Sequence, residues 1–425
     1  RLALVKTGNG TLDFSTFNTM GYSSGLTVNG GNFTFGGNSS QASQMTALGN
    51  STAGGTITLG GGTLNYSGSL TNQTATNNIT LTTATTSTLN NAAGAITYSG
   101  IISGSGNLTK AGAGTLTLTG NNTYTGATTI NAGTLNIQHN NALGTAAGGT
   151  VVGNATALQL QNGITVTGEA LTLSGAGNGG NTGALRSISG NNEWAGNITI
   201  GLNNTRIASD AGLLTISGNI IASNSVLFQG NGNTTVSGII SGSGGVSTSG
   251  LIGATSVLTL SGNNTFTGGV VISNGIVSVS SIKGFGVASG LGATASSAII
   301  IGQTNTSGTL LYTGTGDTSN RTIQIGVNSV TPASSDTGSA TIQNDGSGAL
   351  VFNATNFNTA VASSVANRTL TLAGSNTGSN TISGVIRDNV AATGTVGLIK
   401  SGAGTWILSG NNTYTGATTI NAGRL

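Results

Sequence analysis

The chain has 425 residues, of which only 11 are Lys or Arg and 8 are Asp or Glu, so its formal net charge is +3. Gly, Thr, Asn and Ser dominate, with 74, 71, 49 and 48 positions, and this excludes a conventional mixed core. Cysteine is absent, which excludes disulfides and thiolate metal sites, and the basic residues are scattered singly, which argues against nucleic acid as a partner.

Intrinsic disorder is the first alternative for a chain rich in Gly, Ser and Asn. The low net charge and the 36% share of hydrophobic residues argue against it. No apolar run approaches the length of a membrane-spanning helix, and the opening Arg1-Leu2-Ala3 does not begin a secretion signal. We therefore expect a folded chain whose targeting segment lies outside it.

Four copies of one sequence unit occur along the chain. The first opens at Lys6 with KTGNGTLDF, and the second opens at Lys110 with KAGAGTLTLTGNNTYTGATTINAGTLNI. The third reads SVLTLSGNNTFTGGVVISNGIVSVSS, and the fourth, KSGAGTWILSGNNTYTGATTINAGRL, opens at Lys400. The copies occupy residues 6–35, 110–137, 256–281 and 400–425.

Each copy contains short segments in which polar and apolar residues alternate, as in residues 115–118, 127–130 and 134–137. Alternation with a period of two predicts strands with one buried face. These segments start 12 and 7 residues apart, and the third copy has the same spacing. In the first copy the spacings are 14 and 7, so the first spacing contains a loop that tolerates insertion.

Similar strands return in register after 19 to 24 residues, with Gly-Asn, Gly-Ser and Asn-Asn turns between them. A short strand that recurs at this period is typical of a parallel β-helix. Asn and Gly suit its corners because both tolerate left-handed backbone angles, and Asn side chains can also hydrogen-bond from coil to coil. We expect one continuous β-helix over residues 1–425, with about 21 coils of roughly 20 residues.

The run GAGTLTLTGNNTYTGATTINAGTL and its partner ending in NAGRL resemble the passenger-associated transport repeat of bacterial autotransporters. The resemblance implies a right-handed parallel β-helix that is exported across the outer membrane, with a repeat that serves secretion and folding rather than an active site. The absence of cysteine fits this setting, because disulfides would hinder a passenger that crosses the periplasm unfolded. The positions that match the repeat are Gly120, Asn121, Asn122, Gly126, Gly133, Gly262, Asn263, Asn264, Gly410, Asn411, Asn412, Gly416 and Gly423.

A complete autotransporter also carries a membrane β-barrel, recognisable by alternating strands with aromatic girdles. This chain stops at Leu425 inside a repeat. We expect it to be a fragment of a longer protein, which contacts a membrane only through a translocator outside the chain.

Few residues suggest a ligand site. Arg186 and Arg206 are one coil apart with Trp194 between them, and they predict a ledge that binds a sugar. Asp317 and Asp336 are 19 residues apart and would stack on successive coils. Eight acids in the whole chain are nevertheless few for a groove that binds calcium or cuts a glycosidic bond.

The remaining titratable residues predict no catalytic, cofactor or metal site. His139 has no second His or Cys with which to share a metal, so we expect an exposed turn residue. Lys6, Lys110 and Lys400 share one repeat position, which Thr248 fills in the third copy. No shared chemistry then requires the amine, and we expect these lysines to face solvent.

The sequence favours a non-enzymatic extracellular stalk or adhesin segment, which presents or spaces binding surfaces and aids its own secretion by sequential folding. Its expected partner is a glycan or protein on a host or bacterial surface. One alternative is a filament subunit that associates end to end through exposed strand edges. A weaker alternative is a β-helical enzyme that degrades polysaccharides.

Overall fold

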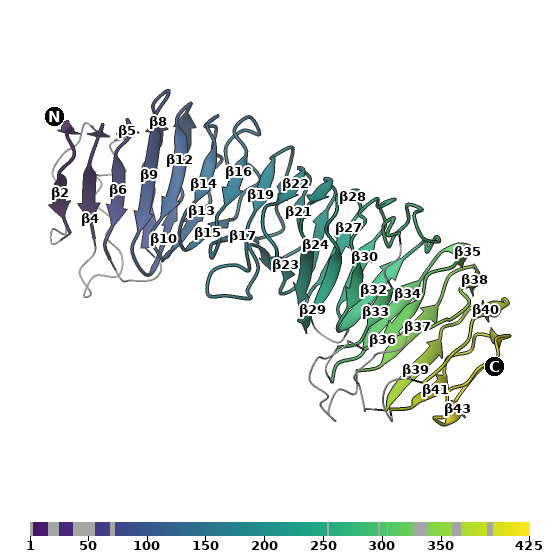
Figure 1. Cartoon of the computed structure of the whole chain (residues 1–425). Helices are drawn as coiled ribbons and strands as arrows, with labels where there is room; N and C mark the ends of the chain where they lie inside the picture. Colours follow the sequence, from purple (N-terminus) through teal and green to yellow (C-terminus); the bar gives the residue numbers. More distant parts are fainter. Residues whose placement is uncertain are drawn as a thin grey trace. The chain divides into compact units, whose positions relative to one another are not determined.

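The computed structural model describes residues 3–15, 25–36, 56–68, 73–252, 255–295, 298–303, 305–326, 338–358, 367–388 and 394–425. Over these residues the chain forms short strands and no helix, and the strands pair in parallel as stacked coils (Figure 1). The predicted all-β parallel β-helix is confirmed. The chain divides into two compact units, residues 1–208 and 209–425.

Three rows of strands form the faces of the first unit, and a further pair joins β18 (Thr165–Val166) to β21 (Asn192–Trp194). One row consists of β1 (Leu4–Lys6), β3 (Leu26–Val28), β5 (Ile57–Leu59), β8 (Ile79–Leu81) and β11 (Ile102–Gly104). A second row consists of β2 (Thr11–Phe14), β4 (Asn32–Phe35), β6 (Thr63–Tyr66), β9 (Thr86–Asn91), β12 (Asn107–Ala111), β14 (Thr128–Ile130), β16 (Thr150–Val152), β19 (Leu171–Leu173) and β22 (Ile198–Ile200). The third row consists of β7 (Gln73–Ala75), β10 (Ala95–Tyr98), β13 (Thr115–Leu118), β15 (Thr134–Ile137), β17 (Ala157–Gln161), β20 (Leu185–Ser189) and β23 (Thr205–Ser209).

The second unit also has three rows, and a pair of short strands, β25 (Ile220–Ala222) and β28 (Ile240–Ser241). The longest row consists of β24 (Leu213–Ile216), β27 (Asn233–Val236), β30 (Val257–Leu260), β32 (Gly275–Val279), β34 (Gly308–Tyr312), β37 (Ala340–Asn344), β39 (Arg368–Ala373), β41 (Val396–Lys400) and β43 (Thr418–Ile420). The next consists of β26 (Val226–Gly230), β29 (Val246–Ile252), β31 (Val270–Ile272), β33 (Ile299–Ile301) and β36 (Ile323–Ile325). The last consists of β35 (Thr315–Ser319), β38 (Gly348–Phe352), β40 (Asn380–Ile382) and β42 (Trp406–Leu408).

Strand register sets the length of each coil. Within the repeats the predicted period is confirmed, since Leu116 pairs with Leu135 and Leu258 pairs with Val277. Other coils are longer, and Gly275 pairs with Gly308, 33 positions along the chain. The extra residues lie in loops between strands, so the chain makes fewer coils than the 21 expected, and that estimate was too high.

The core is a stack of apolar side chains that point into the coils. In β13, Leu116 and Leu118 are 1% and 0% exposed, whereas the two threonines between and beside them are partly exposed. Burying one leucine stabilises a fold by about 1.5–3 kcal/mol. Threonine suits the outer positions because its β-branched side chain favours the extended backbone and its hydroxyl remains hydrated.

Candidate functional site

The second Asn of the GNN turn links neighbouring coils. Asn122 is buried; its Oδ1 accepts a hydrogen bond from the Ile102 backbone N–H at 2.8 Å, and its Nδ2 donates to the Ala142 carbonyl at 2.6 Å. These two partners belong to the preceding and the following coil, 20 residues away on either side. The one side chain therefore satisfies buried backbone groups of two other coils, groups that would be costly to leave unpaired.

The same position repeats this arrangement in the other copies. Asn264 accepts from the Ile240 N–H at 2.8 Å and donates to the Gly290 carbonyl at 2.9 Å. Asn412 accepts from the Ile386 N–H at 2.9 Å. The predicted bonding of Asn side chains from coil to coil is therefore present at the repeat turns.

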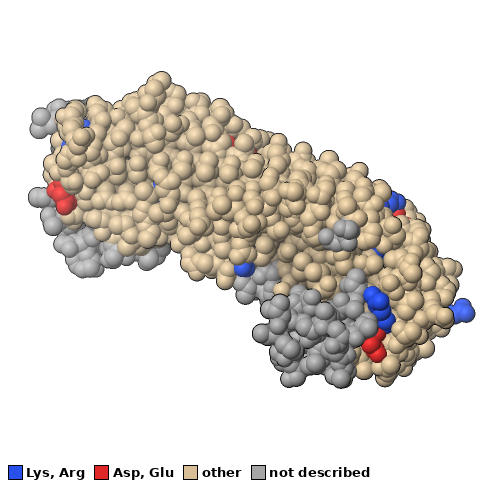
Figure 2. Space-filling model, in the orientation of Figure 1, with Lys and Arg blue, Asp and Glu red and all other residues tan. Residues whose placement is uncertain are grey.

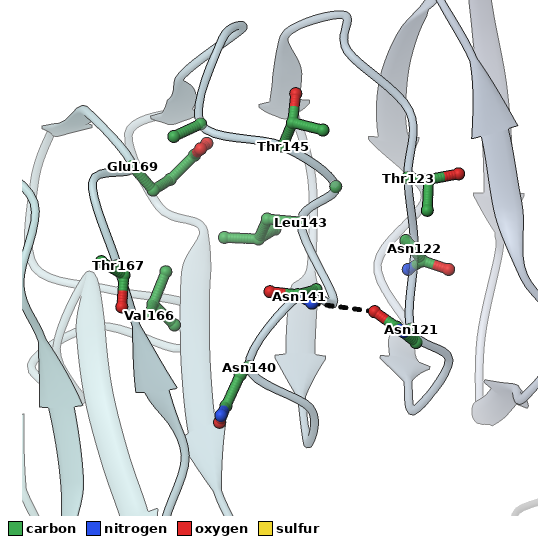
Figure 3. Close-up of a pocket in the computed structure, with 12 residues that line it drawn as sticks. Asn121, Asn122, Thr123, Asn140, Asn141, Leu143, Thr145, Val166, Thr167 and Glu169 are labelled. Atoms are coloured by element: carbon green, nitrogen blue, oxygen red, sulfur yellow. Dashed lines mark hydrogen bonds between the residues drawn. The ribbon is translucent and has the colours of Figure 1, made fainter.

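The first Asn of each turn has a different environment. Asn121, Asn263 and Asn411 are exposed. Asn121 Oδ1 accepts a hydrogen bond from Asn141 Nδ2 at 2.8 Å, an amide pair on the surface of two neighbouring coils (Figure 3). Adjacent residues of one motif thus differ sharply in burial, and they form a matched pair for mutation.

Glycines of the repeat lie against the backbone of the preceding coil. A Cβ built at Gly120 would lie 2.4 Å from the Gly100 carbonyl oxygen, and one at Gly126 would lie 2.1 Å from that of Gly106. The same contact within 2.5 Å of a carbonyl oxygen recurs at Gly262, Gly410 and Gly416. These positions need glycine because any side chain would push two coils apart.

The NAG glycines have a second requirement. Gly133 and Gly423 have φ angles of +67° and +72°, in the left-handed region that side chains disfavour. At each of them a Cβ would also lie within 2.5 Å of a carbonyl oxygen of the preceding coil. The turn that ends the second strand of the repeat therefore requires glycine for two reasons.

The repeat lysines are buried, so the expectation that they face solvent was wrong. Lys110 is 0% exposed, and its Nζ donates to the carbonyls of Ala111, Gly112 and Ala132 at 2.8, 2.7 and 3.0 Å. The first two carbonyls belong to its own turn and the third to the next coil. Each ammonium hydrogen therefore has a partner.

Lys6 and Lys400 repeat this contact. Lys400 Nζ donates to Ser401, Gly402 and Ala422 at 2.7, 2.8 and 3.1 Å. Lys6 Nζ donates to Thr7, Gly8 and Gly30 at 2.8, 2.7 and 3.2 Å. A shared contact of this kind explains why three copies keep a lysine that takes no part in chemistry.

The third copy solves the same problem with a hydroxyl. Thr248 is 1% exposed, and its Oγ1 donates to the Asn274 carbonyl at 2.9 Å. Asn274 occupies the repeat position of Ala132, whose carbonyl Lys110 contacts. Threonine thus replaces only the lysine contact that joins one coil to the next.

An aromatic residue and its partner vary together in the repeats. The Tyr124 hydroxyl lies 2.6 Å from Thr128 Oγ1, and both side chains are buried. In the third copy the corresponding residues are Phe266 and Val270, which are also buried and have no hydroxyls to pair. The polar pair and the apolar pair each avoid a buried hydroxyl without a partner.

A pocket of about 330 Å³ lies beside the second repeat, in the first unit. Residues 121–123, 140–146 and 166–169, from three successive coils, line it (Figure 3). Asn121, Asn141 and Thr167 supply polar atoms, and Leu143 and Val166 supply apolar surface. This pocket, which the sequence did not predict, is the candidate functional site.

Glu169 is the charged side chain of this pocket. It is 3% exposed, and its Oε1 accepts a hydrogen bond from Thr150 Oγ1 at 2.7 Å. Among the described residues, none donates a hydrogen bond to its Oε2. Burial raises the pKa of Glu169, and the Thr150 hydrogen bond partly opposes this rise.

The predicted sugar ledge does not form as expected. Trp194 is 0% exposed, so its indole packs in the core and cannot stack on a ligand. Arg206 lies beside Gly175 and Ala184, as its backbone hydrogen bonds show, whereas Arg186 pairs with Gln159 in the sheet. A coil longer than expected separates the two arginines in register, and the alternation of residues turns Trp194 inward.

The predicted acidic stack is not supported by register. Asp317 pairs with Leu350 on the next coil, 33 residues later, rather than with a residue 19 positions away. It forms an ion pair with Lys283 and accepts a hydrogen bond from the Ile282 N–H at 2.8 Å. Asp336 lies outside the described residues.

Charged side chains are scattered over the visible face and do not form a patch (Figure 2). His139, as expected, lies in an exposed turn, where its Nδ1 accepts a hydrogen bond from the Asn141 N–H at 3.1 Å. Within the described ranges no three His, Cys, Asp or Glu side chains group as metal ligands. The described part of the chain also contains no helix that is long and apolar enough to span a membrane.

Comparison with known proteins supports the resemblance of the repeats. The family model of the passenger-associated-transport-repeat matches residues 4–35, 108–137, 255–279 and 398–425, close to the four predicted copies. The chain is also 36% identical over 151 residues to the adhesin BmaC autotransporter of Brucella suis biovar 1 (strain 1330). That alignment covers 35% of this chain and 4% of the relative. No solved structure matches the chain significantly.

Proposed function

The chain belongs to the passenger domain of an autotransporter, as its four transport repeats and its similarity to an autotransporter adhesin indicate, and we propose that it acts there as a non-enzymatic β-helical stalk and adhesin segment. Its place is outside the bacterial cell, at the outer-membrane surface. In this role the stacked coils hold binding surfaces at a distance from the membrane, and their sequential folding draws the chain outward.

The coil-to-coil bonds of the repeat Asn carry this proposal. Asn122 completes its hydrogen bonds only when the coils that contain Ile102 and Ala142 are both in place. A coil thus gains its full stability from neighbours already stacked, which is the condition for folding that propagates along a solenoid. Propagation from the exported end would oppose backsliding of the chain.

The proposed role as a stalk assumes one continuous β-helix over residues 1–425. Its binding partner would be a glycan or protein on a host or bacterial surface, in keeping with the printed name of the relative as an adhesin. A role without catalysis is in keeping with the acidic residues, which are few and scattered. The surfaces presented to partners are then the loops and the outward faces of the strands.

The export of two neighbouring variants tests the proposal. In the full-length autotransporter, Asn122→Ala removes two buried hydrogen bonds, and Asn121→Ala removes one exposed amide contact. We expect Asn122→Ala to lower the ratio of surface-exposed to total passenger severalfold, and Asn121→Ala to leave it unchanged. Equal display of both variants, measured with antibody on intact cells, would count against folding-assisted export.

A further inference from the structure

We propose that the pocket around Glu169 binds one neutral, hydroxyl-rich unit of a glycan, with Glu169 as its polar anchor. This inference deepens the proposed adhesin function and rests on it. It assigns the contact to a defined site in the second repeat, where the walls belong to three successive coils.

The position of Glu169 is the first observation. The side chain is 97% buried yet lines the pocket, and Thr150 occupies only its Oε1. A carboxyl group that is buried beside a cavity, with one oxygen left without a donor among the described residues, is costly for the fold. A ligand hydroxyl that hydrogen-bonds to Oε2 would remove this cost.

The lining determines the class of ligand. Amides of Asn121, Asn140 and Asn141 and hydroxyls of Thr123, Thr145 and Thr167 surround the cavity, and both groups can donate and accept hydrogen bonds. A sugar hydroxyl also does both, so this lining matches it. No Lys or Arg lines the pocket, which disfavours an anionic ligand.

The apolar part of the lining fits the same ligand. Leu143 and Val166 face the cavity between the polar groups (Figure 3). The C–H face of a pyranose ring needs such a surface, whereas a metal ion or a small anion does not. The volume of about 330 Å³ is in the range of small-molecule sites.

The turn that holds the pocket is built from the repeat itself. Asn122 fixes the coil of residues 121–123 to the next one through the Ala142 carbonyl, and Asn140 Oδ1 accepts a hydrogen bond from the Thr165 N–H at 2.9 Å. These bonds hold all three coils in register at the pocket. The site is therefore preorganised, which lowers the entropy cost of binding.

Titration of the purified 425-residue chain with galactose, mannose and N-acetylglucosamine tests the proposal, with calorimetry and saturation-transfer NMR as readouts. We expect at least one of these sugars to bind at millimolar or lower concentration. Glu169→Gln should weaken binding at least tenfold, and Glu193→Gln, outside the pocket, should not. No binding of any of the three sugars would overturn the proposal.

A second variant guards against loss of folding. Thr167→Leu changes an exposed residue at the edge of the pocket and should abolish binding while the circular dichroism spectrum stays that of the parent. Binding that survives both Glu169→Gln and Thr167→Leu would also overturn the proposal, as would stronger binding of glucosamine than of N-acetylglucosamine, which indicates a cation site. Normal surface display of these variants would leave the proposed role in export intact, so the two proposals fail separately.

Discussion

At the scale of single residues, the lysines show how a β-solenoid uses a charged side chain inside its coils. Lys110 stands between Leu89 and Ile130 in a row of stacked interior positions. Its aliphatic stem continues the apolar row, and its ammonium reaches the turn, where three carbonyls accept its hydrogens. The side chain therefore serves both packing and hydrogen bonding.

The sequence contains a signal for this burial. Leu108 and Lys110 are two residues apart in one strand, as are Leu4 and Lys6, and Leu398 and Lys400. Residues two apart on a strand share a face, so each lysine lies on the face of a buried leucine. The functional argument, which asked only whether the amine was needed for chemistry, missed this structural role.

Replacement of Lys110 by methionine should destabilise the chain at pH 8 to 10. The stem is retained, but three carbonyls lose their donor, and we expect a loss of about 1–3 kcal/mol. Thr199→Met, on an exposed position of β22, is the control and should have little effect. Urea unfolding followed by circular dichroism measures both, and equal stability of the two variants would contradict the role of the lysine.

The stability advantage of Lys110 should also depend on pH. Burial lowers the pKa of Lys110 to about 8 from 10.5. Between these values the unfolded chain binds more protons than the folded one, so folding becomes more favourable as pH rises. The difference in unfolding free energy between the parent and Lys110→Met should therefore grow from pH 8 to pH 10; a difference that stays constant or shrinks would contradict the burial of a titrating amine.

The Tyr124–Thr128 pair should behave as a unit. Thr128→Val alone leaves the buried Tyr124 hydroxyl without its partner and should cost about 1–3 kcal/mol. The double variant Tyr124→Phe/Thr128→Val copies the Phe266–Val270 pair of the third repeat and should recover much of that loss. A double-mutant cycle measures the coupling, and additive effects would refute it.

The fourth repeat supplies the control for this cycle. The Tyr414 hydroxyl pairs with Thr418 Oγ1 at 2.8 Å, but the contact is exposed. Water can replace either partner there, so the same substitutions should have small effects.

At the scale of the strand and the coil, glycine contacts determine how closely neighbouring turns stack. Gly126 allows its coil to lie against the Gly106 carbonyl, and Gly10 has no atom within 4 Å of a built Cβ. The same residue type is thus required at one turn and dispensable at another. Only the structure distinguishes these cases, because both turns are rich in Gly and Asn.

Gly126→Ala should therefore lower the stability of the chain by roughly 1–3 kcal/mol, the usual cost of overpacking. Gly10→Ala, which introduces the same methyl group into open space, should change it by less than about 0.5 kcal/mol. Urea midpoints of the two variants give the comparison. If Gly10→Ala were as harmful as Gly126→Ala, backbone freedom rather than coil contact would explain the glycine.

Strand positions and coil period within the repeats could be predicted from the sequence because alternation and the 19-residue spacing report directly on register. The pocket could not, because its walls come from residues 121–123, 140–146 and 166–169, and the segments that join them have no regular spacing. The ledge of Arg186, Trp194 and Arg206 failed for the same reason. A residue's neighbour on the next coil depends on loop lengths that only the structure gives.

At the scale of the whole molecule, the repeats distribute coil-to-coil bonds along the chain. Asn122 and Lys110 act in the first unit, and Asn264 and Lys400 act in the second. Each unit therefore contains its own sites at which successive coils lock together. In a solenoid of this kind, stability is close to a sum of nearest-neighbour terms, and folding can start at a strong site and spread.

The central claim is that folding spreads coil by coil from the repeats, and hydrogen exchange during refolding tests it most directly. The purified chain is diluted from urea, pulsed with deuterated buffer after increasing delays and analysed by mass spectrometry of its peptides. We expect peptides around Ile102 and Ile240, whose N–H groups bond to the repeat Asn side chains, to gain protection first and their neighbours to follow in order. Asn122→Ala should delay the first of these regions, whereas simultaneous protection of all peptides at one rate would contradict sequential folding.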